Sequence, residues 1–167
     1  DRGERDFRAY AKAYAAHDGI IWDSAAALLL RLQLATGTQL HLLHTQTKGV
    51  VDQLRHAKDR GQDVSAEMNP WAVFLGNDWA NTEPLWAALR DGTIDLVSTD
   101  HAPHTREEKE PGWTDGWKAH TGTPSTQFYV PMLLDAVHQG RLSLERVVGV
   151  TATEPARVFA LRHKGRI

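Results

Sequence analysis

Apolar side chains recur along this chain with two spacings, and segments of the two kinds alternate. Apolar positions three and four residues apart, in segments bounded by Ser, Thr or Gly, are typical of helices that bury one face. Shorter apolar runs are typical of buried strands. The pattern predicts helices over residues 3–16, 25–36, 48–60, 84–90 and 126–138, with two short helices capped by Ser143 and Thr153. It predicts strands over residues 39–44, 64–68 and 94–99, and a long loop over residues 101–125.

Strands that alternate with helices indicate an α/β protein with a parallel sheet flanked by helices. Ser24 is predicted to cap the second helix, and Gly37 to end it. Three strands are too few for a closed eight-stranded barrel. Residues 164–167 resemble the start of another strand, and the first residues carry no cap or strand signal. We therefore expect the 167 residues to be part of a longer protein.

Composition narrows the class of protein. Hydrophobic residues make up 41% and charged residues 24%, which is typical of a globular domain. The net charge of -2 offers no general attraction for nucleic acid or an anionic membrane. There is no signal-peptide pattern and no apolar run of the roughly 20 residues that span a bilayer, so we expect a cytoplasmic protein. Because the chain has no cysteine, any metal must be held by His, Asp or Glu.

The end of the third predicted strand carries the strongest chemical signal. Asp100 follows the apolar run 94–97 and precedes His101 and His104. Barrel enzymes place their chemistry where strands end, and an Asp there can bind a metal and accept a proton from water. Strand alternation puts Ile94, Leu96, Ser98 and Asp100 on one face. The alternative interpretation is a polar turn after a core strand.

A second candidate lies at the end of the first predicted strand. Alternation groups Leu40, Leu42 and His44 on one face, with His41 and Leu43 on the other. If His44 faces a barrel axis, His41 faces the helices as a packed or hydrogen-bonded structural residue. Both His44 and Asp100 would then stand at the carboxyl ends of strands, where they could share one zinc ion.

Several motifs resemble those of a known family. Residues 99–104 read TDHAPH, followed by Glu108 and Lys109, and residues 85–95 form the lead-in LWAALRDGTID. Residues 40–45 read LHLLHT, and residues 154–161 read EPARVFAL. In this order the motifs resemble the cyclic amidohydrolases, the dihydroorotase, allantoinase and dihydropyrimidinase group of the amidohydrolase superfamily.

The resemblance implies a (β/α)8 barrel with one or two zinc ions. Residues 1–167 would be its C-terminal half, without the N-terminal half or the small β-sandwich domain. The resemblance implies that Asp100 is a metal ligand and general base and that His44 is a metal ligand. His104, Gly122 and Pro124 would contact a cyclic amide or ureide substrate, although a loop hydrogen bond explains His104 equally well. It also implies a homo-oligomer.

The chain departs from the family pattern in three places. The paired histidines and carbamylated lysine of the N-terminal half are absent. The family strand that usually ends Glu-x-x-Pro-His here runs from Glu67 to Trp71, and an indole nitrogen only donates. The segment 76–82 is short where the family has a further strand. His44 and Asp100 alone fall short of the roughly three protein ligands that zinc requires, so this chain alone should bind zinc weakly and be inactive.

Three functional interpretations follow. The first is a zinc-dependent hydrolase that opens a C–N bond in a dihydroorotate-, allantoin- or hydantoin-like ring. The second is a non-catalytic relative acting as a scaffold or assembly subunit, which Trp71 favours and the retained Asp100 and His44 oppose. The third is a globular α/β segment whose histidines are satisfied by structural contacts.

Overall fold

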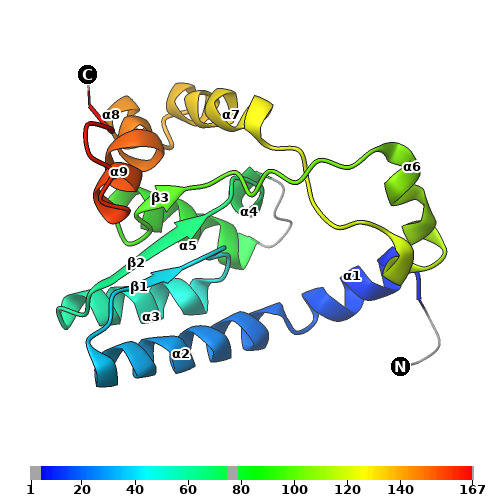
Figure 1. The fold of residues 1–167 in the computed structure, drawn as a ribbon, viewed down its shortest axis with the longest axis horizontal. Coiled ribbons are helices and arrows are strands. Elements are labelled where there is room, and N and C mark those ends of the chain that lie inside the picture. The colour runs from blue at the N-terminus through cyan, green and yellow to red at the C-terminus, as the bar shows by residue number, and fades with distance from the viewer. Residues whose placement is uncertain (1–4, 75–78, 167) are drawn as a thin grey trace.

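A three-stranded parallel sheet forms the centre of the computed structural model, which describes residues 5–74 and 79–166. The strands are β1 (Leu40–Leu42), β2 (Val64–Met68) and β3 (Leu96–Val97), in the order β1-β2-β3 (Figure 1). The predicted strand over residues 64–68 is confirmed. The other two strands are shorter than predicted. β1 ends at Leu42, before the left-handed residue His44, and β3 runs only from Leu96 to Val97, before the left-handed residue Asp100.

Helices pack against the apolar residues of this sheet. Figure 1 shows α2 and α3 below the sheet and α7 to α9 above it. The helices are α1 (Phe7–Ala15), α2 (Asp18–Thr36), α3 (Lys48–Asp59), α4 (Trp71–Phe74), α5 (Trp79–Asp91), α6 (Arg106–Lys109), α7 (Thr126–His138), α8 (Leu144–Val148) and α9 (Glu154–Val158). A π-helical turn, Gly149–Thr153, joins α8 to α9, and two 3₁₀ turns, Glu110–Trp113 and Gly116–Lys118, follow α6.

Some predicted helix ends are confirmed and others are wrong. Gly37 ends α2 with φ 69° and donates its N–H to Gln33, and the Ser143 side chain caps α8. Ser24 caps nothing, because α2 begins at Asp18 and Trp22 already packs against the core. Thr153 lies in the π turn and donates its hydroxyl to the Gly165 carbonyl instead of capping α9.

Two helix starts are also wrong: α5 begins at Trp79, five residues before the predicted start at Pro84, and α1 begins only at Phe7. The short segment noted at residues 76–82 lies partly outside the described residues, at positions 76–78.

The two faces of the sheet differ in chemistry. Leu42, Val64 and Ala66 pack against α2 and α3, and Met68 and Val97 join a second core cluster with α5, α7 and α8. Strand alternation and the register His41 opposite Ser65 place a polar set on the other face. This set consists of His41, Ser65, Glu67 and, just past β3, Ser98. The polar face is therefore where site chemistry can occur.

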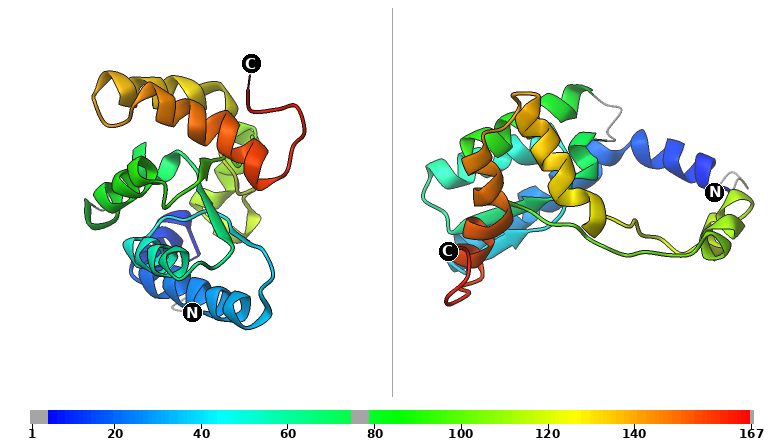
Figure 2. Two further views of the ribbon diagram at one scale, coloured as in Figure 1. Left: turned by 90° about the vertical axis from the view of Figure 1, so that its left-hand side faces the viewer. Right: turned by 90° about the horizontal axis from the view of Figure 1, so that it is seen from above.

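The segment between β3 and α7 projects from the body and packs beside α1 (Figures 1 and 2). We call residues 105–121 of this segment the excursion. The excursion fits closely against α1 because Gly112 lacks a Cβ, which would lie 2.0 Å from the Phe7 ring. At its base, Ala102 donates its N–H to the Thr123 carbonyl at 3.2 Å, and His101 forms a parallel bridge with Thr123. The two ends of the excursion are thus tied together.

Helix α2 is apolar on its outer side as well as its buried side. Ile20, Leu28 and Leu32 are 71%, 61% and 52% exposed. A helix that is apolar all round is normally covered on more than one side. No helix within the described part of the chain is both long enough and apolar enough to cross a membrane.

Candidate active site

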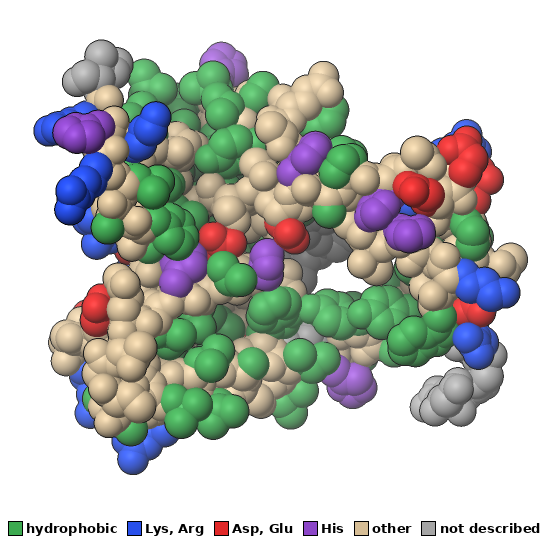
Figure 3. All heavy atoms as spheres, viewed as in Figure 1, with side chains coloured by type: hydrophobic (Ala, Val, Ile, Leu, Met, Phe, Trp, Pro, Cys, Tyr) green, Lys and Arg blue, Asp and Glu red, His purple; other side chains and the backbone are tan. Residues whose placement is uncertain are grey.

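His44 and Asp100 converge across the carboxyl end of the central strand: His44 follows β1 and Asp100 follows β3. Their Nδ1 and Oδ2 atoms are 4.0 Å apart. Both residues have left-handed backbones, with φ of 53° and 45°. Non-glycine residues adopt this conformation at a cost and cluster at functional sites. In Figure 3, acidic and histidine side chains gather at the centre of the visible face, in a hollow between the upper and lower helices.

The prediction that strand alternation places His44 on the same face as Leu42 is wrong. Leu42 is buried against α2 and α3, so its face of β1 is the helix face. His41 lies on the opposite, polar face and bonds to Ser65 and Glu67. It is hydrogen-bonded and packed as predicted, with its ring against Phe159, but it lies on the face opposite α2 and α3. Because β1 ends at Leu42 and His44 is left-handed, alternation does not extend to His44.

His44 and Asp100 can supply two ligands of a metal site, which is fewer than a complete site needs. Nδ1 of His44 is buried and has no hydrogen-bond partner among the described residues. Two ligand atoms on a tetrahedral zinc ion lie about 3.3 Å apart, so 4.0 Å requires only a small side-chain rotation. Residues 5–74 and 79–166 contain no group of three His, Cys, Asp or Glu that could hold a metal. The described chain therefore does not supply a complete metal centre.

Glu67 is a buried carboxylate beneath this pair, on the central strand. Its Oε1 accepts a hydrogen bond from Ser98 Oγ at 2.6 Å, and its Oε2 lies 3.2 Å from His41 Nε2. Burial alone would raise the pKa of Glu67, but the hydrogen bonds and charge of His41 and the bond from Ser98 outweigh it. The pKa of Glu67 is therefore below its ordinary value, and the side chain is anionic at neutral pH.

Sequence reasoning missed the role of His101. Its Nδ1 accepts the N–H groups of Ser125 and Thr126 at 2.9 and 3.1 Å, which caps the start of α7. Ser125, 1% exposed, also accepts a bond from Trp71 Nε1 at 2.8 Å. Trp71 thus acts as a donor, as predicted, and fastens α4 to α7. No spacing in the sequence signals contacts 24 and 54 residues apart.

The predicted substrate residues lie on the segment that follows Asp100, and two of them, His104 and Gly122, have structural partners. His104 Nδ1 is 3.3 Å from Glu108 Oε2, which corresponds to the loop interaction considered above. Gly122 has φ 133°, and a Cβ there would lie 2.4 Å from the Ala102 carbonyl oxygen. Lys109 Nζ donates to the Gly122 carbonyl at 2.6 Å. Pro124 is exposed. The structure thus brings residues 122–124 beside His101 and Ala102.

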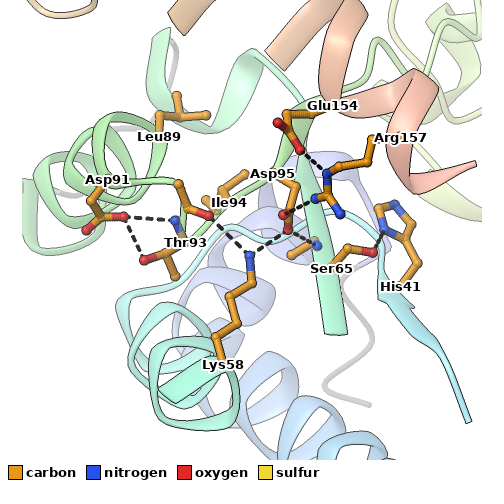
Figure 4. A network of polar contacts seen from close by, with 12 residues as sticks. His41, Lys58, Ser65, Leu89, Asp91, Thr93, Ile94, Asp95, Glu154 and Arg157 are labelled. Carbon is orange, nitrogen blue, oxygen red and sulfur yellow. Dashed lines mark hydrogen bonds and ion pairs between the residues drawn. The ribbon is translucent and has the colours of Figure 1, made fainter. Parts of the chain in front are cut away.

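A second buried carboxylate, Asp95, lies at the start of β3. Figure 4 shows it between Lys58 of α3 and Arg157 of α9. The Asp95 oxygens accept from Lys58 Nζ and the Ala66 N–H, both at 2.8 Å, and from Arg157 Nη2 at 3.3 Å. These bonds join strand, helix and C-terminal region without involving His44 or Asp100.

Comparison with known proteins identifies the family. The chain is 39% identical over 162 residues to a dihydroorotase from Halobacterium salinarum. It is 35% identical over 150 residues to an L-hydantoinase from Paenarthrobacter aurescens. The solved L-hydantoinase from Arthrobacter aurescens superposes with a TM-score of 0.76 at 34% identity, covering 86% of this chain. The chain belongs to the cyclic amidohydrolase family.

The match covers only part of these relatives. The aligned region is 86% of this chain but 36% of the Halobacterium enzyme, and 79% of this chain but 33% of the Paenarthrobacter enzyme. D-hydantoinase from Thermus sp. aligns over 87% of this chain and 36% of its own, with a TM-score of 0.81 at 27% identity. No family model matches the chain. The resemblance drawn from the motifs is confirmed, and this cyclic amidohydrolase chain spans about a third of its relatives' length.

Proposed function

We propose that this chain is the C-terminal half of the (β/α)8 barrel of a zinc-dependent hydrolase that opens a C–N bond in a cyclic amide or ureide. In this proposal His44 is a metal ligand, and Asp100 is both a metal ligand and the general base. The observation that carries it is the convergence of these two side chains, on left-handed backbones, just past the carboxyl ends of the two outer strands, β1 and β3. Homology to dihydroorotases and hydantoinases supports the substrate class.

Asp100 has the exposure that a general base needs. Its side chain is 60% exposed, so water can reach the carboxylate. Asp100 would take a proton as the water oxygen adds to the ring carbonyl carbon, and return it to the ring nitrogen as the C–N bond breaks. The products are a carboxylic acid and an N–H group. A bound zinc ion would polarise the carbonyl and lower the pKa of water.

The remaining ligands would come from polypeptide outside these residues. The described chain offers two converging donors, whereas catalytic zinc sites use about three protein ligands. The exposed apolar side of α2 is consistent with further chain packing beside it. The assembled protein would act on a small molecule and form a homo-oligomer, as implied by the family resemblance.

A non-catalytic scaffold is the second candidate, and one observation favours it. Trp71 stands where the family motif has a histidine, and its only polar hydrogen is committed to Ser125. Such a residue contributes to packing but not to metal binding.

The deciding experiment uses the protein expressed from its whole coding sequence. Ring opening of dihydroorotate, hydantoin and allantoin would be assayed together with bound zinc per chain. Asp100→Asn is expected to lower the rate by about 100-fold or more, since general base catalysis contributes that much. His44→Gln is expected to lower zinc content.

The matched control is Asp135→Asn, on the exposed side of α7, which should change neither measurement. An Asp100→Asn protein with wild-type activity would overturn the role of Asp100. A well-folded, zinc-free and inert protein would overturn the hydrolase and leave the scaffold.

A further inference from the structure

One residue on the central strand is bonded to both segments that carry the candidate site. Glu67 uses its backbone carbonyl to accept the Thr45 N–H at 2.8 Å, directly after His44. It uses its carboxylate to accept the Ser98 hydroxyl at 2.6 Å, two residues before Asp100. We propose that Glu67 is a positioning residue that sets the separation of His44 and Asp100.

The site needs a residue that holds it in place, because the left-handed backbone conformation of His44 and Asp100 costs free energy. His44 and Asp100 are both left-handed non-glycine residues, which persist only when surrounding contacts hold them. On the Asp100 side, Ser98 is fixed twice, by its N–H to the Met68 carbonyl at 3.0 Å and by its hydroxyl to Glu67. Without the carboxylate, one of these two bonds is lost and the segment before Asp100 can rotate.

His41 is also in contact with the Glu67 carboxylate, and the position of its ring hydrogen can be measured. A carboxylate only accepts hydrogen bonds, so the His41 Nε2 that faces Glu67 carries the hydrogen. In the neutral ring, Nδ1 then carries no hydrogen and accepts from Ser65 Oγ at 2.8 Å. Both Glu67 and Ser65 are buried, at 7% and 6% exposed, so water does not compete for these bonds. The position of the hydrogen on His41 therefore depends on the chemical identity of residue 67.

Asp95 provides a matched control on the same sheet. Like Glu67 it is a buried carboxylate, 7% exposed, in the neighbouring strand region. Its partners are Lys58, Arg157 and the Ala66 N–H, and none of these three bonds involves His44, Ser98 or Asp100. Loss of Asp95 weakens the fold, whereas loss of Glu67 should also move the site.

The experiment follows histidine side chains by NMR in the full chain labelled with ¹⁵N-histidine. In Glu67→Ala and Ser98→Ala we expect the His44 resonances to shift from their wild-type positions. In Glu67→Gln the amide oxygen can still accept from Ser98, so His44 should stay near its wild-type position. The amide N–H₂ now faces His41, so the His41 hydrogen should move from Nε2 to Nδ1.

In Asp95→Asn we expect a lower melting temperature with unchanged His44 resonances. The proposal is overturned if His44 does not shift in either Glu67→Ala or Ser98→Ala, or if Asp95→Asn shifts it as much. If Glu67→Ala does not fold, Ser98→Ala and Glu67→Gln still decide the question. Ser98→Ala changes no charge near His44, so a shift there reports on geometry. None of these readouts measures activity, so they hold even if the proposed hydrolase activity fails.

Discussion

Replacing Asp95 by alanine should destabilise the protein strongly, although Asp95 lies outside the candidate site. The change leaves the buried Ala66 N–H without its acceptor, which costs about 1–3 kcal/mol. Lys58 is a quarter exposed and its lost bond contributes roughly 1 kcal/mol, whereas the largely exposed Arg157 contributes less than about 0.5 kcal/mol. The sum is about 3 kcal/mol, or a fall of roughly 6–12 °C in melting temperature for a chain of this size.

Urea unfolding followed by circular dichroism measures this free energy directly. Asp135→Ala is the control, because the Asp135 side chain is exposed on α7 and accepts a bond from Gln139 one turn later. It should change the free energy of unfolding by less than about 0.5 kcal/mol. A loss below about 1 kcal/mol in Asp95→Ala, or a loss equal to that of the control, would refute the assignment of Asp95 as the link between the sheet, α3 and α9.

Three further changes test other parts of the fold. Trp71→Phe removes the donor to Ser125 and should cost about 1 kcal/mol in urea unfolding; an unchanged stability would show that this bond does not hold α7. Gly122→Ala should cost about 1–3 kcal/mol because of its φ of 133° and the close Ala102 carbonyl, and it should cost more than Gly140→Ala, where the added Cβ meets open space. Burial would raise the pKa of Asp91, but bonds from Thr93 and Arg55 lower it below its ordinary value. The stabilisation by Asp91 is therefore present above about pH 4 and lost as pH falls through the lowered pKa. Asp91→Asn removes this titration, so the variant should lose less stability than the wild type when the pH is lowered over that range. The difference should stay below about 1 kcal/mol, because Asp91 is half exposed. An acid unfolding curve identical to that of the wild type would contradict this.

The sequence was most informative where structure depends on local pattern. The strand over residues 64–68, the helix over residues 126–138 and the glycine end of α2 follow from periodicity and capping alone. Periodicity and capping did not predict the start of α2. Trp22 lies in the helix because it packs against a core formed by segments distant in the sequence. This tertiary contact outweighs the preference of Ser24 for the first position of a helix.

The candidate site shows the same division. Asp100 and His44 were recognisable because their residue types follow short apolar runs, and the structure brings them together. The orientation of β1 was predicted incorrectly, since alternation cannot detect a strand that stops two residues early. The roles of Glu67, His101 and Ser125 depend on contacts between residues more than 20 positions apart, which a single sequence does not encode in any local spacing.

The closed base of the excursion has a consequence for how this protein can vary. Because Ala102 and Thr123 are bonded to each other, residues 105–121 leave and rejoin the body at nearly the same point. Insertions, deletions or grafted loops after Lys109, which donates to the Gly122 carbonyl, would leave this base and Asp100 in place. The excursion is therefore the natural place to redesign this chain, since its length and surface can change while the chemistry beside it stays in place.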